Sequence, residues 1–147
     1  MISIVDLKAA LNGVIQNKYG NSYKYYGNEV TEGYVKPSFF TQLLPVQLGN
    51  VTTNFSEKRF SFIITYFQKK VDEADALTKV DELMEAFGLK VKVGDRYVNV
   101  SDFEYDFIGE KSNILQMSLN VSFLDGIKKE ETHQLMNELG LKQRMEV

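Results

Sequence analysis

Apolar and polar residues alternate without a break over residues 113–123. A period of two places alternate side chains on opposite sides of an extended chain, so this pattern predicts a β-strand about 36 Å long. The polar side carries no charge. The stretch therefore predicts a long strand in an antiparallel sheet with one buried face, formed by Leu115, Met117, Leu119, Val121 and Phe123, and one polar face, formed by Gln116, Ser118, Asn120 and Ser122.

Further strands are expected in the first half of the chain. Tyr23, Tyr25 and Tyr26 indicate a short strand before a turn at Gly27 and Asn28. Residues 38–46 follow Pro37 and form the next candidate, because a proline suits the start or edge of a strand. Its partner is expected to be the alternating stretch with Phe60, Phe62, Ile64 and Tyr66. The polar segment 49–56, rich in Gly, Asn and Thr, then predicts a long hairpin loop between the two.

The second half of the chain repeats the strand pattern. Gly94 and Asp95 stand between two short apolar stretches and predict a tight hairpin turn. A separate strand is expected at residues 103–107, followed by a turn at residues 109–112 that leads into the long strand. The residues that carry these patterns are Val91, Val93, Tyr97, Val98, Val100, Phe103, Tyr105 and Phe107.

Three segments show helical periodicity. The first is expected at residues 5–18, where Ser3 and Asp6 resemble a capping box and residues 20–22 stop the helix. In the second, Asp75 and Thr78 precede an apolar stripe that ends before Gly88, and the third is expected at residues 129–138, before Gly140 and a loose tail at 141–147. The first two stripes are Ile4, Leu7, Leu11, Val14 and Ile15, and Leu77, Val80, Leu83, Met84 and Phe87; the third is Leu135, Met136 and Leu139.

These elements give the order α-β-β(-β)-α-β-β-β-β-α. Strands that arrive in runs favour an α+β fold, a mostly antiparallel sheet with helices packed on one face. The length of 147 residues suits a single domain, 1–147, with one core.

Composition excludes several classes of protein. The chain has no cysteine, which rules out a disulfide scaffold and any thiolate site. Seventeen basic and twenty acidic residues give a net charge of −3 without a dense basic block, so tight nucleic-acid binding is not expected. We expect neither export nor membrane spanning, because no leader-like segment or long apolar run is present.

Candidate chemistry is sparse. Asp102, Glu104 and Asp106 fall on one side of a strand and form a candidate Mg²⁺ or Mn²⁺ site, but a half-buried strand with a solvated acidic side explains them equally. No Glu-x-Lys follows on a neighbouring strand, and the single histidine, His133, lies among surface-type residues. Glycine-rich nucleotide motifs are absent. We therefore predict no catalytic, cofactor or metal site, with a small metal-dependent hydrolase as the alternative of a different class.

Aromatic residues are concentrated in the first half of the chain. Phe39 and Phe40 are adjacent, as are Tyr66 and Phe67, so each pair points to both faces of a strand. One face is expected to belong to the core. The other face belongs either to a second layer of the same subunit or to a contact with another subunit.

The stretch at residues 33–40, Gly-Tyr-Val-Lys-Pro-Ser-Phe-Phe, followed by Phe-Ile-Ile-Thr-Tyr-Phe at residues 62–67, resembles the small tail terminator proteins of phages and phage-like tail particles of Gram-positive bacteria. The first helix with the Tyr-rich stretch, the middle helix and the late long strand agree with that family, so the resemblance covers nearly the whole chain. Ser38 stands where many relatives have a cysteine.

The resemblance implies a structural virion protein and no enzyme. Copies are expected to form a ring, as a hexamer, that caps the head-proximal end of the tail tube, stops its growth and offers a surface to the head. Expected partners are other copies of the chain and the tail tube protein, with sheath and head–tail connector proteins as further candidates. DNA passes through the lumen without specific binding, and assembly takes place in the host cytoplasm.

Such a ring needs two unlike lateral surfaces. Our candidates for these surfaces are the exposed aromatic positions and the polar loop, represented by Phe39, Phe40, Asn50, Thr52, Asn54, Tyr66 and Phe67. A tail completion protein, another head–tail connector component, and a binding module with an open sheet face remain alternatives.

Overall fold

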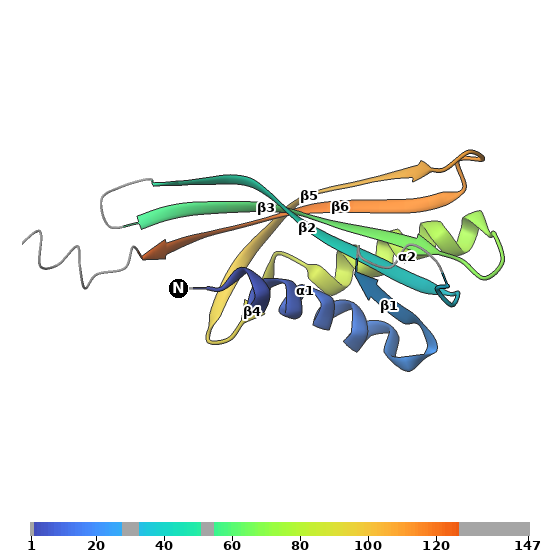
Figure 1. The fold of residues 1–147 in the computed structure, drawn as a ribbon, viewed down its shortest axis with the longest axis horizontal. Helices are drawn as coiled ribbons and strands as arrows, with labels where there is room; N and C mark the ends of the chain where they lie inside the picture. Colours follow the sequence, from blue (N-terminus) through green and yellow to red (C-terminus); the bar gives the residue numbers. More distant parts are fainter. Residues whose placement is uncertain (1, 28–32, 51–54, 127–147) are drawn as a thin grey trace, which may run out of the picture.

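The computed structural model of the chain describes residues 2–27, 33–50 and 55–126. Within these residues the chain forms two α-helices, a short 3-10 helix and six strands (Figure 1). In chain order they are α1 (Ile4–Tyr19), η1 (Gly20–Ser22), β1 (Lys24–Gly27), β2 (Ser38–Asn50), β3 (Phe55–Phe67), α2 (Glu73–Phe87), β4 (Lys90–Val93), β5 (Arg96–Ile108) and β6 (Ile114–Gly126).

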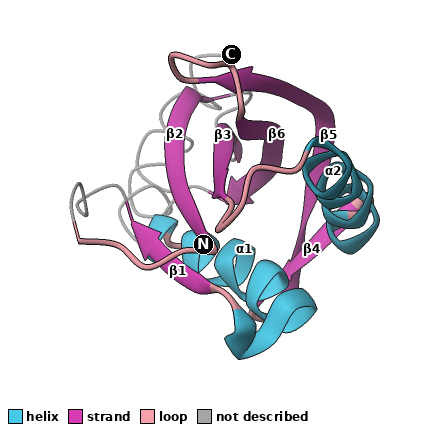
Figure 2. Cartoon of the chain, turned by 90° about the vertical axis from the view of Figure 1, so that its right-hand side faces the viewer, coloured by secondary structure: helices cyan, strands magenta, loops and turns pink. Residues whose placement is uncertain are grey.

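All six strands belong to one sheet in the order β1-β2-β3-β6-β5-β4. Every neighbouring pair is antiparallel except β1 and β2, which are parallel. The sheet is strongly curled, and α1 and α2 both lie within its curve (Figure 2). This arrangement confirms the predicted α+β class, with helices on one face of a mostly antiparallel sheet.

The core lies between the helices and the concave face of the sheet. The predicted buried side of the long strand is confirmed, because Leu115, Met117, Leu119, Val121 and Phe123 are all buried. Phe60, Phe62, Ile64 and Tyr66 of β3 face the same side and are buried as predicted. Leu7, Leu11 and Ile15 of α1 have no exposed surface and belong to this core as predicted, whereas Ile4 of the predicted stripe is 49% exposed.

The helix ends follow the expected capping chemistry. Ser3 Oγ accepts a hydrogen bond of 3.0 Å from the backbone N–H of Asp6 at the start of α1. α2 ends before Gly88, whose φ of 59° is a backbone conformation that favours glycine. The start of α2 is earlier than the stripe indicated, because Asp72 caps it by accepting from Ala74 N–H at 3.1 Å.

The predicted loop 49–56 was too long. Gly49 pairs with Glu57 and Asn50 with Ser56, so the strands continue close to the tip of the hairpin. A bulge between Pro45 and Gln47 takes up the irregularity that the proline introduces. The β2–β3 hairpin therefore projects well beyond the helices (Figure 1).

The two strands predicted between residues 96 and 107 form one strand, β5. Ser101 pairs with Asn120 and Glu104 with Ser118, so three steps on β5 match two on β6. The extra residue is a β-bulge at Asp102 and Phe103, where Asp102 has a φ of 55°. The bulge shifts the core-facing positions of β5 from even numbers (Val98, Val100) to odd ones. In the sequence, this change of phase was interpreted as a break between two strands.

The predicted C-terminal helix at 129–138, the tail at 141–147 and His133 lie outside the described residues. Among the described helices, neither is long and apolar enough to span a bilayer.

Candidate assembly surfaces

The adjacent aromatic residues of β2 and β3 do point to opposite faces of the sheet. Phe39 and Tyr66 are buried on the helix side, where their rings stack with centroids 4.9 Å apart. Phe40 and Phe67 lie on the other face, half-buried, with ring centroids 5.0 Å apart. The structure thus places Phe39 and Tyr66 in the core of the subunit and leaves Phe40 and Phe67 accessible to a partner.

Tyr34 and Tyr26 complete the aromatic cluster on the outer face. Tyr34 contacts Phe40 and Phe67 at centroid distances of 5.0 Å each, and Tyr26 contacts Phe40 at 5.1 Å. Lys36 Nζ lies 5.8 Å from the Tyr34 ring centroid. We call Tyr26, Tyr34, Phe40 and Phe67 the outer aromatic cluster; it covers the part of the sheet next to β1.

A buried lysine sits below the inner aromatic residues. Lys79 of α2 is 5% exposed, and its Nζ lies 5.2 to 5.5 Å from the ring centroids of Tyr19, Tyr23 and Tyr66. The ammonium forms an ion pair with Asp75 at 3.1 Å and a longer one with Glu82 at 3.7 Å. The predicted stripe of α2 was therefore wrong in part: Leu77 and Met84 are 39% and 43% exposed, and Ala76 and Lys79 are buried instead.

Asp75 connects this lysine to β3. Its Oδ2 accepts hydrogen bonds from Tyr66 Oη at 2.7 Å and Gln68 Nε2 at 3.0 Å. Burial raises the pKa of Asp75, but the hydrogen bonds from Gln68, Tyr66 and Lys79 outweigh burial and hold it below the ordinary value. Burial also lowers the pKa of Lys79, yet its hydrogen bonds and the Asp75 charge raise it overall. Both groups are therefore held in their charged forms.

Burial, together with the hydrogen bond to Asp75, raises the pKa of the Tyr66 hydroxyl well above its ordinary value. Tyr66 is therefore a hydrogen-bond donor and not a base. The network of Lys79, Asp75 and Tyr66 therefore has a structural character: it is an ion pair with its hydrogen bonds formed, packed beneath aromatic rings.

A second charged network lies at the opposite end of the sheet. Asp125 is fully buried near the end of β6 and accepts from the backbone N–H of Ile2 at 3.2 Å, Lys58 Nζ at 3.2 Å and the Arg96 guanidinium. Burial raises its pKa, but the hydrogen bonds from Arg96, Lys58 and Ile2 outweigh burial and lower it overall. Asp125 continues the odd-numbered buried positions of β6 by one more step, which was the only sequence signal for it.

The predicted acidic positions do not form a metal site. The bulge separates Asp102 from Glu104 and Asp106, and Asp102 Oδ2 instead accepts from Asn120 Nδ2 at 3.1 Å. Asp106 Oδ1 accepts from the backbone N–H of Phe107 at 2.8 Å. Within residues 2–27, 33–50 and 55–126, no group of three His, Cys, Asp or Glu side chains could hold a metal ion.

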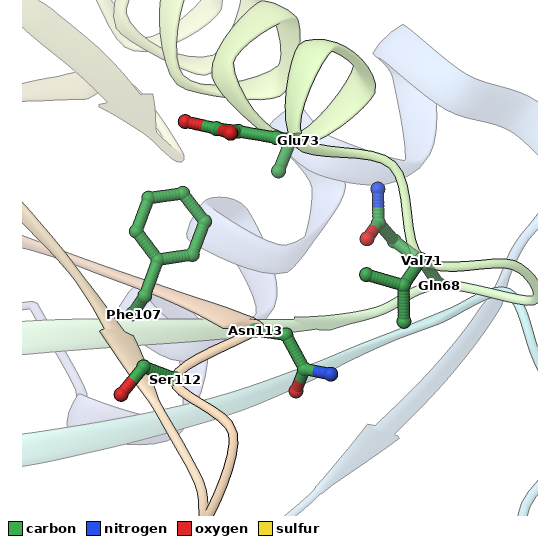
Figure 3. Close-up of a pocket in the computed structure, with 7 residues that line it drawn as sticks. Gln68, Val71, Glu73, Phe107, Ser112 and Asn113 are labelled. Atoms are coloured by element: carbon green, nitrogen blue, oxygen red, sulfur yellow. The ribbon is translucent and has the colours of Figure 1, made fainter.

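A cavity of about 290 Å³ lies between the start of α2 and the β5–β6 turn (Figure 3). Among the described residues that line it, Glu73 is the only carboxylate, and the others are Gln68, Val71, Ala76, Phe107, Ser112 and Asn113. A single carboxylate beside amides and apolar groups offers no acid–base pair, so this cavity is no candidate for catalysis.

The β2–β3 hairpin exposes apolar side chains. Val46 and Leu48 are 58% and 56% exposed, and Leu44 is 39% exposed. Leu124, at the neighbouring end of β6, is 51% exposed. Asn50, a predicted contact residue, is exposed at the end of β2, whereas Thr52 and Asn54 lie outside the described residues. Exposed apolar residues on a projecting hairpin are candidates for a contact with a partner.

Comparison with protein families decides the class of this molecule. A family model described as phage tail terminator protein matches residues 6–133. The chain belongs to the phage tail terminator family. It is therefore a structural protein of a phage-type tail and a virion component, in agreement with the resemblance seen in the sequence.

Solved structures share the fold of this tail terminator. A chain from a structure described as the virion of a native gene transfer agent (GTA) particle matches with a TM-score of 0.53 and 14% identity, over 82% of this chain and 95% of that chain. Another solved chain, whose description names no function, matches with a TM-score of 0.54 and 10% identity over 87% of this chain and 98% of its own. Comparison with curated protein sequences finds no significant match.

Proposed function

We propose that six copies of this tail terminator form a ring at the head-proximal end of the tail tube, where the ring stops polymerisation of the tube protein and offers the surface to which the head attaches. The observation that carries this proposal is the family match over residues 6–133. Ring formation in the host cytoplasm precedes joining to the head, and no membrane takes part.

The polar part of the helix-free face, on β5 and β6, suits the lumen of such a ring. Gln116, Ser118, Asn120 and Ser122 alternate with the buried residues of β6, and Glu104 and Asp106 extend this face onto β5. DNA is a polyanion, and a polar face with added carboxylates lets it pass without binding it. The opposite face carries α1 and α2 and is placed toward the outside of the ring.

The remaining exposed surfaces supply contacts for partners. The outer aromatic cluster and the apolar side chains of the β2–β3 hairpin are unlike in position and shape, which a closed ring of identical subunits requires. We assign the two ends of the ring to the tube protein and to the head–tail connector, with sheath protein as a further partner on the outside.

No catalytic step is part of the proposal. The bulge lies between Asp102 and the other two acidic positions of β5, and among its described lining residues the cavity between α2 and the β5–β6 turn has one carboxylate. A structural role accounts for the charged networks around Lys79 and Asp125, because each fastens a helix or the N-terminal segment to the sheet.

The proposal is tested by adding the purified protein to polymerising tube protein and measuring tube lengths by negative-stain electron microscopy. Addition before growth is expected to shorten the tubes in proportion to the amount added. Addition after growth is the control: lengths stay unchanged while one end of each tube gains a cap. Tubes of unchanged length in both orders, with caps, favour a connector or completion role, and tubes without caps contradict the proposal.

A further inference from the structure

Two of the long strands have a backbone edge that no other described strand covers. β1 pairs with β2 only at Ser38–Thr41, so among the described residues positions 42–50 of β2 have a partner on one side only. β4 pairs with β5 only at Arg96–Asn99, and Val100 N–H donates to Leu89 O. Within the same described part of the chain, positions 101–108 of β5 likewise pair on one side, with β6. The two free edges have almost equal length, about 27 Å each.

The two free edges lie on opposite sides of the sheet and are offset from each other along the strands. β2 and β5 flank the central strands β3 and β6, and the β2–β3 and β5–β6 hairpins project in opposite directions (Figure 1). The register aligns Thr41 with Tyr105 through Ile64 and Met117. From this level the free edge of β2 runs toward one end only, whereas the free edge of β5 extends about equally to both sides, so the centres of the two edges are offset along the strands.

We propose that the free edge of β2 in one subunit pairs with the free edge of β5 in the next subunit, so that the sheet continues from copy to copy around the ring. This inference rests on the proposed ring. It names a second copy of the chain as the partner, because each edge offers a row of N–H and C=O groups of similar length that has no partner strand among the described residues. Two positions interrupt these rows: Pro45 has no N–H, and the N–H of Phe107 donates to Asp106 Oδ1.

Strand direction supports this pairing. The pairs β2–β3, β3–β6 and β6–β5 are each antiparallel, so β2 and β5 run in opposite directions within a subunit. Rotation about a ring axis preserves those directions relative to the axis. β5 of one copy and β2 of the next therefore meet as antiparallel strands, which is the pairing already used between the long strands.

The stagger needed to overlap the edges fits a closed barrel. Full overlap requires neighbouring copies to shift along the strands by about four to six residues, or about 13–20 Å. Each copy spans four long strands, about 19 Å across the sheet. The resulting strand tilt is about 35–46°, close to the tilt of about 35–45° found in closed β-barrels. A ring of staggered sheets is thus compatible with closure.

The side chains on the two edges are unlike. Positions 42–50 carry no charged residue, and they expose Leu44, Val46 and Leu48. The free edge of β5 presents Tyr105, which is 53% exposed, together with the half-buried Phe103 and the carboxylates of the other face. Charges, prolines and bulges protect the edge strands of monomeric proteins from pairing. The free edge of β2 has a proline and a bulge at positions 45–47 but no charge, so residues 42–44 and 47–50 keep an edge that can pair in the assembly. Two unlike edges give a head-to-tail contact that closes into a ring.

Cysteine cross-linking tests the pairing directly, since the chain has no cysteine of its own. Leu48 pairs with Lys58 and Tyr105 with Met117, which places both on the helix-bearing face. The double variants Leu48→Cys/Tyr105→Cys and Leu48→Cys/Phe103→Cys sample the two ends of the stagger range. The matched control is Leu48→Cys/Glu104→Cys, because Glu104 neighbours Tyr105 on the opposite face. Tails isolated from lysates are oxidised and analysed on non-reducing gels.

At least one of the two helix-face pairs is expected to give a ladder of covalent oligomers up to the hexamer, whereas the Glu104 control stays mostly monomeric. In an equimolar mixture of the Leu48→Cys and Tyr105→Cys single variants, cross-linking is expected to stop at the dimer. Intact rings without a ladder from either pair overturn the edge pairing and leave the ring proposal standing. Dimers formed by Leu48→Cys alone overturn it also, because they indicate a two-fold contact.

A charge on the edge provides a second, independent test. Leu48→Lys is expected to abolish rings in negative-stain images while changing the melting temperature by no more than a few degrees, because its side chain is already exposed. Val71→Lys is the control, since Val71 is 62% exposed and lies on neither free edge. Normal rings from Leu48→Lys overturn the inference. Absence of rings from the wild-type protein, both alone and on tube ends, contradicts the proposed function itself.

Discussion

Lys79 Nζ lies 3.1 Å from Asp75 Oδ1, one helical turn away on α2, and both groups face the tyrosine rings that line the concave side of the sheet. The pair fastens α2 to β3, because Asp75 also accepts the Tyr66 hydroxyl hydrogen bond. A buried ion pair of this kind matters for stability mainly because loss of either partner would leave the other charge buried without a counter-charge.

Replacement of Lys79 by methionine is expected to lower the free energy of unfolding by about 2 kcal/mol, because Asp75 then loses its cationic partner while the apolar volume is retained. Chemical denaturation of the purified subunit measures the loss. Lys70→Met, at an exposed position, serves as the control and is expected to stay within about 0.5 kcal/mol of wild type. Equal stability of the two variants would contradict a structural role for the Lys79 network.

Stability is expected to fall at acidic pH. The pKa values of Asp75 and Asp125 are lowered in the folded state, so the unfolded chain takes up protons first as pH falls below about 5. Their contribution is complete above the ordinary carboxyl pKa of 3.8 and is lost as pH falls through the lower folded values. Denaturation between pH 7 and pH 2 measures this slope.

The variant Asp125→Asn isolates one of the two carboxylates. It is expected to be less stable than wild type at pH 7, because Arg96 and Lys58 lose their anionic partner, and to show a shallower decline toward low pH. A decline as steep as that of wild type would show that Asp125 contributes nothing to it.

The neighbours Phe39 and Phe40 are expected to respond differently to truncation. Phe39→Ala removes a fully buried ring and should cost about 3–5 kcal/mol, which leaves little folded subunit. Phe40→Ala removes a half-buried ring of the outer aromatic cluster and should cost about 2 kcal/mol or less, while reducing ring or tail assembly. Thermal melting and electron microscopy separate the two effects. Normal assembly by a folded Phe40→Ala subunit would remove the outer aromatic cluster from the list of contact surfaces.

Divalent metal ions are expected to leave the melting temperature unchanged. Binding to a folded site raises the melting temperature through mass action, and among the described residues no three His, Cys, Asp or Glu side chains are grouped so that they could hold a metal ion. Melting with and without Mg²⁺ or Mn²⁺, in wild type and in Asp106→Asn, is the measurement. A specific rise in wild type that the variant lacks would revive the hydrolase alternative.

Much of the fold followed from periodicity alone. The buried faces of β3 and β6 and the buried stripe of α1 each follow a repeat in the sequence, because burial on one face leaves a period of two or 3.6 residues. The parallel pairing of β1 with β2 did not follow, since the four residues of β1 carry no information on direction. The bulge at Asp102 was visible as a change of phase between Val100 and Phe103, which also fits a break between two strands.

The surfaces were harder to predict than the core. Phe40 and Phe67 were separated from Phe39 and Tyr66 only by the structure, because an alternating strand does not reveal which face the helices cover. The buried position of Asp125 was not predicted, because a carboxylate after an apolar row normally indicates the end of a strand. Only the structure reveals the three hydrogen-bond donors that allow it to be buried. The free edges of β2 and β5 depend on where β1 and β4 stop pairing, which no local pattern encodes.

The central claim, termination of the tail tube, is tested most directly by deleting the gene and measuring tail lengths in the lysate by negative-stain electron microscopy, with a plasmid copy of the wild-type gene as the control. The account predicts headless tubes longer than wild-type tails, and a return to normal length on complementation. Headless tails of normal length would contradict termination and indicate a completion or connector role, and unaltered infectious particles would contradict any essential part in the tail.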